Sequence, residues 1–111
     1  MRGEHLGELE ELVLLIIGSL YREAYALAIL DEITANTNRK PDVTAIHAVL
    51  RRLEKKGYLN SRMGGATSQR GGRRKRYFSL SQAGRKVLDD TMVLRMSLYK
   101  KLPGLASNAG I

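Results

Sequence analysis

The chain has 111 residues, 43% of them hydrophobic and 27% charged, with a formal net charge of +8 at pH 7; this balance predicts one folded domain and argues against disorder. The absence of cysteine excludes a disulfide framework, a thiolate zinc site and a cysteine nucleophile. The longest apolar run, residues 12–17, is too short for a membrane helix and the N-terminus does not resemble a signal peptide, so the sequence predicts a cytoplasmic protein with no membrane partner.

Two amphipathic helices are predicted first in chain order. Residues 8–21 place apolar side chains at helical spacing, with three glutamates in the first turn, where the helix dipole favours negative charge. Gly18 lies inside this pattern and predicts close approach of another helix, because glycine otherwise costs about 1 kcal/mol relative to alanine in a helix. Residues 25–37 form the second helix, which ends before Pro41.

A third helix is predicted from a cap at Asp42 or Thr44 to Lys56, with Gly57 as its left-handed stop. One face is apolar, and the opposite face combines cations with small side chains that allow close approach to another surface. The apolar face consists of Ile46, Val49, Leu50 and Leu53. The opposite face and its flanks carry Thr44, Ala45, His47, Ala48, Arg51, Arg52 and Lys55.

Two short strands follow, residues 58–63 and 73–80, joined by a loop with four glycines. The loop has no apolar anchor, so we expect it to be mobile. Alternation in the second strand predicts that Phe78 and Leu80 face one side and that Tyr77 and Ser79 face the other. Cations gather on the loop and the second strand: Arg70, Arg73, Arg74, Lys75 and Arg76.

Ser81 is the predicted cap of a fourth helix that ends at about Leu102, before Pro103. Its apolar surface is wider than a three-helix core can cover, and a partner chain is the usual solution. The predicted dimerisation row consists of Val87, Thr91, Leu94, Leu98 and Leu102. The sequence thus divides into a folded domain (residues 1–80), a dimerisation helix (81–102) and a flexible tail (103–111).

Positive charge is confined to one segment of the chain. Residues 39–76 hold twelve lysines and arginines against two acids, a net of +10, so the rest of the chain sums to −2. A surface that is merely solvated would mix the two signs. A block of one sign on a helix and the adjoining loop is instead typical of a surface that binds a polyanion.

The sequence offers no constellation for catalysis or for a metal. His47 with Asp42 or a serine imitates part of a catalytic triad, but nucleophile-elbow and phosphate-loop patterns are absent. His5 and His47 lie far apart along the chain, which does not suggest a metal site. We therefore expect a protein that is not an enzyme and that binds no cofactor.

The order helix, helix, helix, strand, basic loop, strand, helix is that of a winged helix-turn-helix, a mainly α fold with a small β-wing. Residues 43–59 resemble the recognition-helix segment of the PadR family of transcriptional regulators. Residues 73–85 resemble that family's wing signature of basic residues, two aromatics and a Leu-Thr/Ser-x-x-Gly turn. Two residues depart from the family pattern: Ala24 stands in place of a glycine and His47 in place of a tyrosine. The resemblance covers about residues 9–90, and the single C-terminal helix is similar to the family's compact branch.

The resemblance implies a dimeric repressor that binds palindromic double-stranded DNA. The third helix would enter the major groove and the cationic loop would contact the DNA backbone. In the compact branch the last helix pairs two subunits and can hold a small aromatic or cationic effector between them. The chain has no tryptophan, so Met92, Met96 and Tyr99 are the nearest candidates for such a ligand. Non-specific DNA or RNA binding and protein docking remain alternatives, because a fold does not fix a function.

Overall fold

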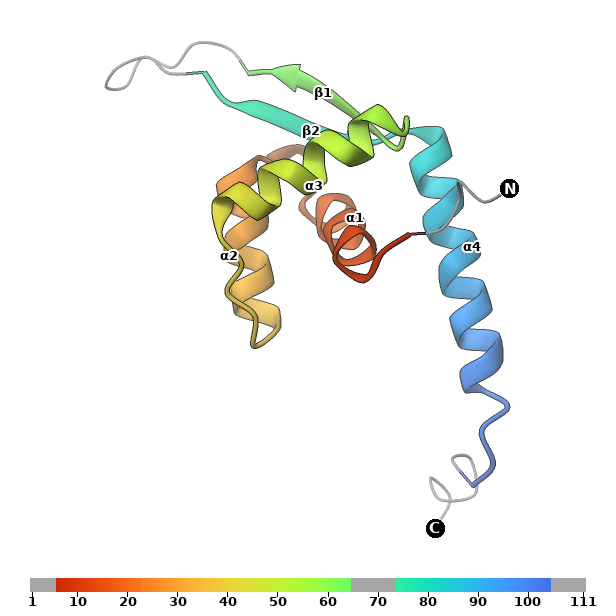
Figure 1. Ribbon diagram of the computed structural model, residues 1–111. Helices are drawn as coiled ribbons and strands as arrows, with labels where there is room; N and C mark the ends of the chain where they lie inside the picture. Colours follow the sequence, from red (N-terminus) through yellow and green to blue (C-terminus); the bar gives the residue numbers. More distant parts are fainter. Residues whose placement is uncertain (1–5, 65–73, 105–111) are drawn as a thin grey trace.

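The computed structural model describes residues 6–64 and 74–104 (Figure 1). Three helices precede a two-stranded antiparallel hairpin, and a fourth helix follows it, so the predicted winged helix-turn-helix is confirmed. The elements are α1 (Glu8–Leu20), the 3-10 helix η2 (Tyr21–Glu23), α2 (Ala26–Asn36), α3 (Val43–Lys55), β1 (Leu59–Met63), β2 (Arg76–Leu80) and α4 (Gln82–Tyr99).

The ends of three helices differ in detail from the prediction. Helix α1 stops at Leu20 because Tyr21 adopts a φ of 57°, a left-handed value that is rare for a residue with a side chain. Asp42 occupies the N-cap position of α3, but its side chain makes no capping hydrogen bond. Helix α4 ends at Tyr99 rather than near Leu102, with Lys100 as its C-cap.

Helix α1 is the central element of the core and contacts α2, α3, β2 and α4 (Figure 1). All four apolar residues predicted on α3 are buried in this core, which α2 and β1 also help to enclose. The largest fully buried side chains come from the first three helices: Val13, Leu14, Ile17, Ile29, Ile33, Ile46, Leu50 and Leu53. Burial of this row fixes which face of α3 turns inward, and therefore which face remains for a partner.

The hairpin pairs Leu59 with Leu80 and Met63 with Arg76. The backbone N–H of Phe78 donates a 2.8 Å hydrogen bond to the carbonyl of Ala24, which fastens β2 to the junction between η2 and α2. Phe78 is buried and Ser79 exposed, as the alternation predicted. The prediction for Gly18 was wrong: a Cβ placed there would lie 3.3 Å from Cδ1 of Leu80, so its close neighbour is strand β2 and not another helix.

Helix α4 is anchored at its start and projects from the body at its end (Figure 1). The Ser81 hydroxyl accepts a 2.9 Å hydrogen bond from the Gly84 N–H, which confirms the predicted cap, and donates to the carbonyl of Gly57 at 2.6 Å. Gly57 has the expected left-handed φ of 84°. Only Gly84, Val87 and Leu88 of α4 are buried. No helix within the described ranges combines the length and apolar character that a bilayer crossing requires.

Candidate nucleic-acid interface

The face of α3 that points away from the core carries the predicted contact residues. Thr44, His47, Arg51, Arg52 and Lys55 are exposed, while the two alanines between them are half-buried. On this face the first turns carry small side chains and the last turns carry cations. The backbone of the first turns can therefore come close to the surface of a partner. One helix thus presents an apolar face to the core and a cationic face to solvent.

Arg52, one of the predicted contact residues, also forms an ion pair inside the protein that the sequence did not reveal. The carboxylate of Glu10 in α1, whose side chain is only 7% exposed, accepts hydrogen bonds from the Gly7 N–H at 2.9 Å, from Lys56 Nζ at 3.0 Å and from Arg52 Nε at 3.3 Å. Burial alone would raise the pKa of Glu10, but the hydrogen bonds from Gly7, Lys56 and Arg52 outweigh burial and lower it below its usual value. Two cations at the end of α3 are therefore held against α1.

An open notch of about 360 Å³ separates α3 from β2. It brings together three predicted contact residues, His47, Arg51 and Arg76. The Ser61 hydroxyl donates to the Glu54 carboxylate at 2.7 Å and accepts from Arg76 Nη1 at 2.9 Å, so one hydrogen-bond chain joins α3, β1 and β2. This chain orients Arg76 toward α3. The notch is also lined by Glu54, whose carboxylate accepts from Ser61, so two arginines and His47 face one acid there and the two arginines leave a net positive charge that suits an anionic group such as a phosphate.

Aromatic rings and cations alternate at the base of the hairpin. Lys75 Nζ lies 4.1 Å from the ring centroid of Tyr25, and Arg62 Cζ lies 4.8 Å from that of Tyr77. The two tyrosine rings meet edge to face, with centroids 5.6 Å apart. Arg74 Nε donates to the carbonyl of Gly64 at 3.2 Å. Tyr77 is thus a packing residue, and the stack fixes where the cations leave the strands.

The remaining predicted DNA contacts are the cations of the loop and the second strand, of which the structure describes three. Arg74, Lys75 and Arg76 are exposed. Arg70 and Arg73, with the loop expected to be mobile, lie outside the described residues, as do residues 105–111 of the expected tail. In the described ranges, no three His, Asp or Glu side chains gather in a way that could hold a metal ion.

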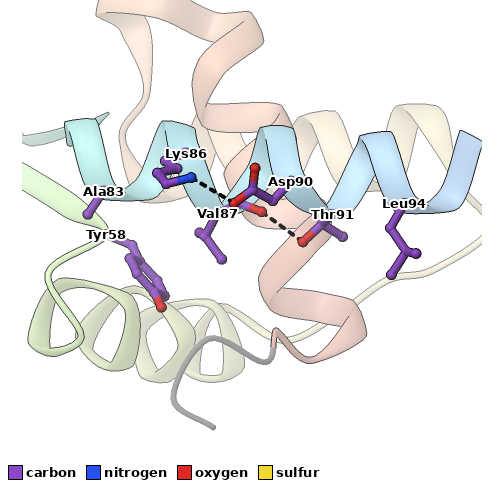
Figure 2. Close-up of a pocket in the computed structure, with 7 residues that line it drawn as sticks. All are labelled: Tyr58, Ala83, Lys86, Val87, Asp90, Thr91 and Leu94. Carbon is purple, nitrogen blue, oxygen red and sulfur yellow. Dashed lines mark hydrogen bonds and ion pairs between the residues drawn. The ribbon is translucent and has the colours of Figure 1, made fainter. Parts of the chain in front are cut away.

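The predicted dimerisation row changes in exposure along α4. Val87 is only 8% exposed, and Thr91 is half-buried with its hydroxyl donating to the Val87 carbonyl at 2.8 Å. Figure 2 shows both residues with Leu94 along one side of α4, beside a cavity of about 490 Å³ that Tyr58 also lines. Leu94, Leu98 and Leu102 are each more than half exposed. This row runs from the core into solvent.

The three predicted ligand residues lie together on the exposed end of α4. Met92, Met96 and Tyr99 line a shallow groove of about 550 Å³. Leu94, Arg95, Leu98 and Leu102 complete its lining. The groove is mainly apolar and open to solvent.

Comparisons with known proteins place this geometry among transcriptional regulators. The model of the transcriptional regulator PadR-like family matches residues 13–90. A PadR family transcription regulator from Clostridium difficile R20291 superposes with a TM-score of 0.71 at 19% identity, over 85% of this chain and 93% of that one. A PadR family transcriptional regulator from Eggerthella lenta DSM 2243 superposes with a TM-score of 0.62 at 25% identity, over 84% of this chain and 80% of that one. Bacillus subtilis PadR, crystallised in complex with operator DNA, superposes with a TM-score of 0.61 at 19% identity, over 78% of this chain and 47% of that one. No curated protein sequence matches the chain.

Proposed function

This chain belongs to the transcriptional regulator PadR-like family, and we propose that it acts as a dimeric repressor that binds an inverted-repeat DNA operator. Family membership confirms that it is a transcriptional regulator and not an enzyme. In the proposal, α3 enters the major groove and the hairpin lies along the neighbouring backbone. The crystal structure of Bacillus subtilis PadR in complex with operator DNA supports binding to an operator, because that protein shares the fold.

The observation that carries the proposal is the division of α3 into two faces. Its apolar residues are buried, while Thr44, His47, Arg51 and Lys55 are exposed on the other side. The half-buried Ala45 and Ala48 leave room for the helix to approach base edges. An arginine that contacts a guanine with two hydrogen bonds discriminates against other bases by about 1–3 kcal/mol. We assign this role to Arg51, the exposed arginine of α3 that lines the notch.

The hairpin supplies the second part of the proposed interface. Arg74, Lys75 and Arg76 are exposed on β2 and the residues just before it. Together with Arg70 and Arg73 they would contact phosphates, which adds affinity and salt dependence but little sequence information. Arg52 is proposed as a supporting contact only, because its Nε is already bonded to Glu10.

Helix α4 is proposed to pair two copies of the chain. Leu94, Leu98 and Leu102 are large, apolar and exposed, and a second α4 would cover them. Such a dimer would place two α3 helices about 34 Å apart, one turn of DNA. An aromatic or cationic effector would bind where Met92, Met96 and Tyr99 meet the partner chain. Repression would follow because a dimer seated on an operator blocks access to a promoter that overlaps it.

The test is binding of the full-length protein to the DNA upstream of its own coding region, measured by fluorescence anisotropy at several salt concentrations against random-sequence competitor. We expect tight binding that resists the competitor and weakens steeply with salt. Arg51→Ala should lose about 5- to 150-fold in specific affinity, from the 1–3 kcal/mol of one base contact. Lys100→Ala changes an exposed cation directly after α4, is the matched control and should bind like the wild type.

Two results would contradict the proposal. If random DNA competes equally well, the protein binds DNA without sequence preference. If neither DNA binds, the fold serves RNA binding or protein docking instead.

A further inference from the structure

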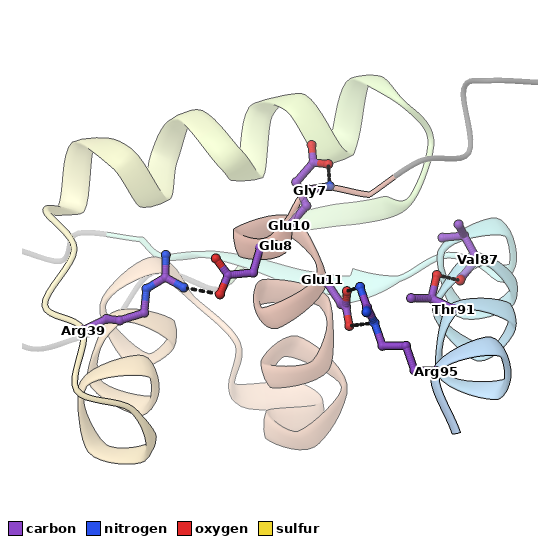
Figure 3. Close-up of polar contacts among 8 residues, drawn as sticks. All are labelled: Gly7, Glu8, Glu10, Glu11, Arg39, Val87, Thr91 and Arg95. Atoms are coloured by element: carbon purple, nitrogen blue, oxygen red, sulfur yellow. Dashed lines mark hydrogen bonds and ion pairs between the residues drawn. The ribbon is translucent and has the colours of Figure 1, made fainter. Parts of the chain in front are cut away.

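The first turn of α1 holds cations from three different parts of the chain. Figure 3 shows two of these contacts on opposite sides of the turn, one with the segment before α3 and one with α4. A third carboxylate of the same turn binds the end of α3. The pairs are Glu8 with Arg39, Glu10 with Arg52 and Lys56, and Glu11 with Arg95. The recognition helix and α4 are therefore both fastened to one turn of α1.

The pair between Glu11 and Arg95 has a well-defined geometry. Arg95 Nε donates to Glu11 Oε2 at 3.0 Å and Nη2 donates to Oε1 at 2.8 Å, which is the two-pronged arrangement that fixes both side chains in orientation. The Glu11 side chain is only 12% exposed, while that of Arg95 is 61% exposed. The hydrogen bond and the charge of Glu11 raise the pKa of Arg95 above its ordinary value, which further favours the charged guanidinium.

The pair lies far along α4 from the residues that anchor the start of the helix, so it can control the direction of α4. The start of α4 is held by the Ser81 cap and by Gly84, and no residue beyond Leu88 is buried. In the described part of the chain, the Glu11–Arg95 contact is the ion pair that joins α4 to the rest of the molecule, because the other two on α4 are internal to the helix. It lies about 16 Å from Gly84, at a rise of about 1.5 Å per residue.

We propose that Glu11 and Arg95 set the angle between α4 and the DNA-binding body, and through it the spacing between operator half-sites that the dimer prefers. This inference rests on the proposed pairing of two copies through α4. From Gly84 to Leu98 the helix extends about 21 Å. A rotation of about 10° over that length moves each α3 by about 4 Å, close to the rise of about 3.4 Å per base pair. A small change of angle is therefore enough to alter the preferred spacing.

The exposure of Arg95 makes this role separable from stability. The Arg95 guanidinium is 61% exposed and regains water when the pair is broken, so the loss of stability should be small enough to leave the fold intact. Removing the pair should still release the angle, because the other contacts of α4 with the core are the buried residues near its start and the partly buried Met92, a flexible side chain that can adapt its packing. A purely structural contact would change thermal stability and leave the spacing preference as it was.

The experiment selects duplexes from a random library with the full-length protein and reads the distance between half-sites by sequencing. Arg95→Glu places two like charges together and should shift or broaden the preferred spacing by at least one base pair. Affinity for the wild-type spacing should fall about tenfold. The double variant Glu11→Arg with Arg95→Glu restores opposite charges and should recover the original spacing. Arg85→Glu makes the same charge change on α4, in a residue whose ion pair is internal to the helix, and is the control.

Three outcomes would overturn the inference. One is an unchanged spacing for Arg95→Glu, and another is a double variant that does not recover. A third is an Arg95→Glu protein that is monomeric by light scattering, since the pair would then act in assembly. A wild-type selection with no inverted repeat would instead overturn the proposed function, and this inference with it.

Discussion

Replacing Glu10 by glutamine tests whether the buried carboxylate fastens α3 to α1. Glutamine keeps the size of the side chain, and its carbonyl can still accept the hydrogen bond from Gly7. The variant loses the negative charge, and the new amide N–H₂ in place of Oε2 would face Lys56 Nζ and Arg52 Nε, which are also donors. Only the 3.1 Å hydrogen bond from Lys56 to the remaining oxygen would persist, so the end of α3 would be held mainly by apolar packing.

The expected loss in the free energy of unfolding follows from the exposure of the partners. A hydrogen bond to a charged group contributes about 1.5–3 kcal/mol. The side chains of Lys56 and Arg52 are 34% and 54% exposed, so both cations regain water when Glu10 is neutralised. We therefore expect a loss of about 1–2 kcal/mol in total, which corresponds to a fall in melting temperature of about 4–10 °C for a chain of this size.

Urea unfolding at several pH values, at one protein concentration, measures this difference. The pKa of Glu10 is lowered in the folded state, so its contribution to stability is complete above the unfolded value of about 4.3 and is lost as the pH falls through the folded value. The difference between wild type and variant should be constant from pH 7 to pH 5 and shrink toward pH 3. Glu8→Gln is the control, because the Glu8 side chain is 80% exposed, and it should change stability by less than about 0.5 kcal/mol. An equal loss in both variants, or a difference that persists undiminished at pH 3, would refute the reasoning.

Two further predictions concern α4. Leu94→Glu should give a folded monomer by light scattering, because Leu94 is 59% exposed within one chain and a second copy is proposed to cover it; a variant that stays dimeric would place the interface elsewhere. Gly84→Ala should destabilise the fold by about 3 kcal/mol or more in thermal melts, because its Cβ would overlap the backbone carbonyl of Tyr58, which cannot rotate away as a side chain could. The exposed Gln82→Ala should melt like the wild type, and an equally stable Gly84→Ala would show that α4 can move off the hairpin.

Local signals in the sequence were sufficient to predict the fold. The apolar row of α3, the left-handed Gly57 and the cap at Ser81 each depend on residues that are close along the chain. Such signals define where elements begin and end and which face turns inward. The order of the elements then leaves few arrangements other than a winged helix-turn-helix.

Contacts between distant residues could not be predicted in the same way. Glu10 was interpreted from sequence as a favourable charge at the start of α1, yet its partners lie 42 and 46 residues further along the chain. A signal was present, because Glu10 stands four residues before Leu14 and seven before Ile17, on the row that is buried. An acid on a buried row requires a partner. Periodicity alone cannot say which cation that partner is.

The internal ion pairs also change how the positive charge of the chain should be counted. Of the four cations from Arg51 to Lys56, Arg52 and Lys56 bond to Glu10, whereas Arg51 and Lys55 have no ion pair within the described residues. Salt dependence of DNA binding scales with the number of phosphates that are neutralised, by about 0.9 per contact. Because Arg51 is proposed to contact a base, the end of α3 should therefore contribute about one such phosphate contact, from Lys55, rather than four. The net charge of the basic segment overstates its contribution to DNA affinity, because part of that charge holds the recognition helix in place.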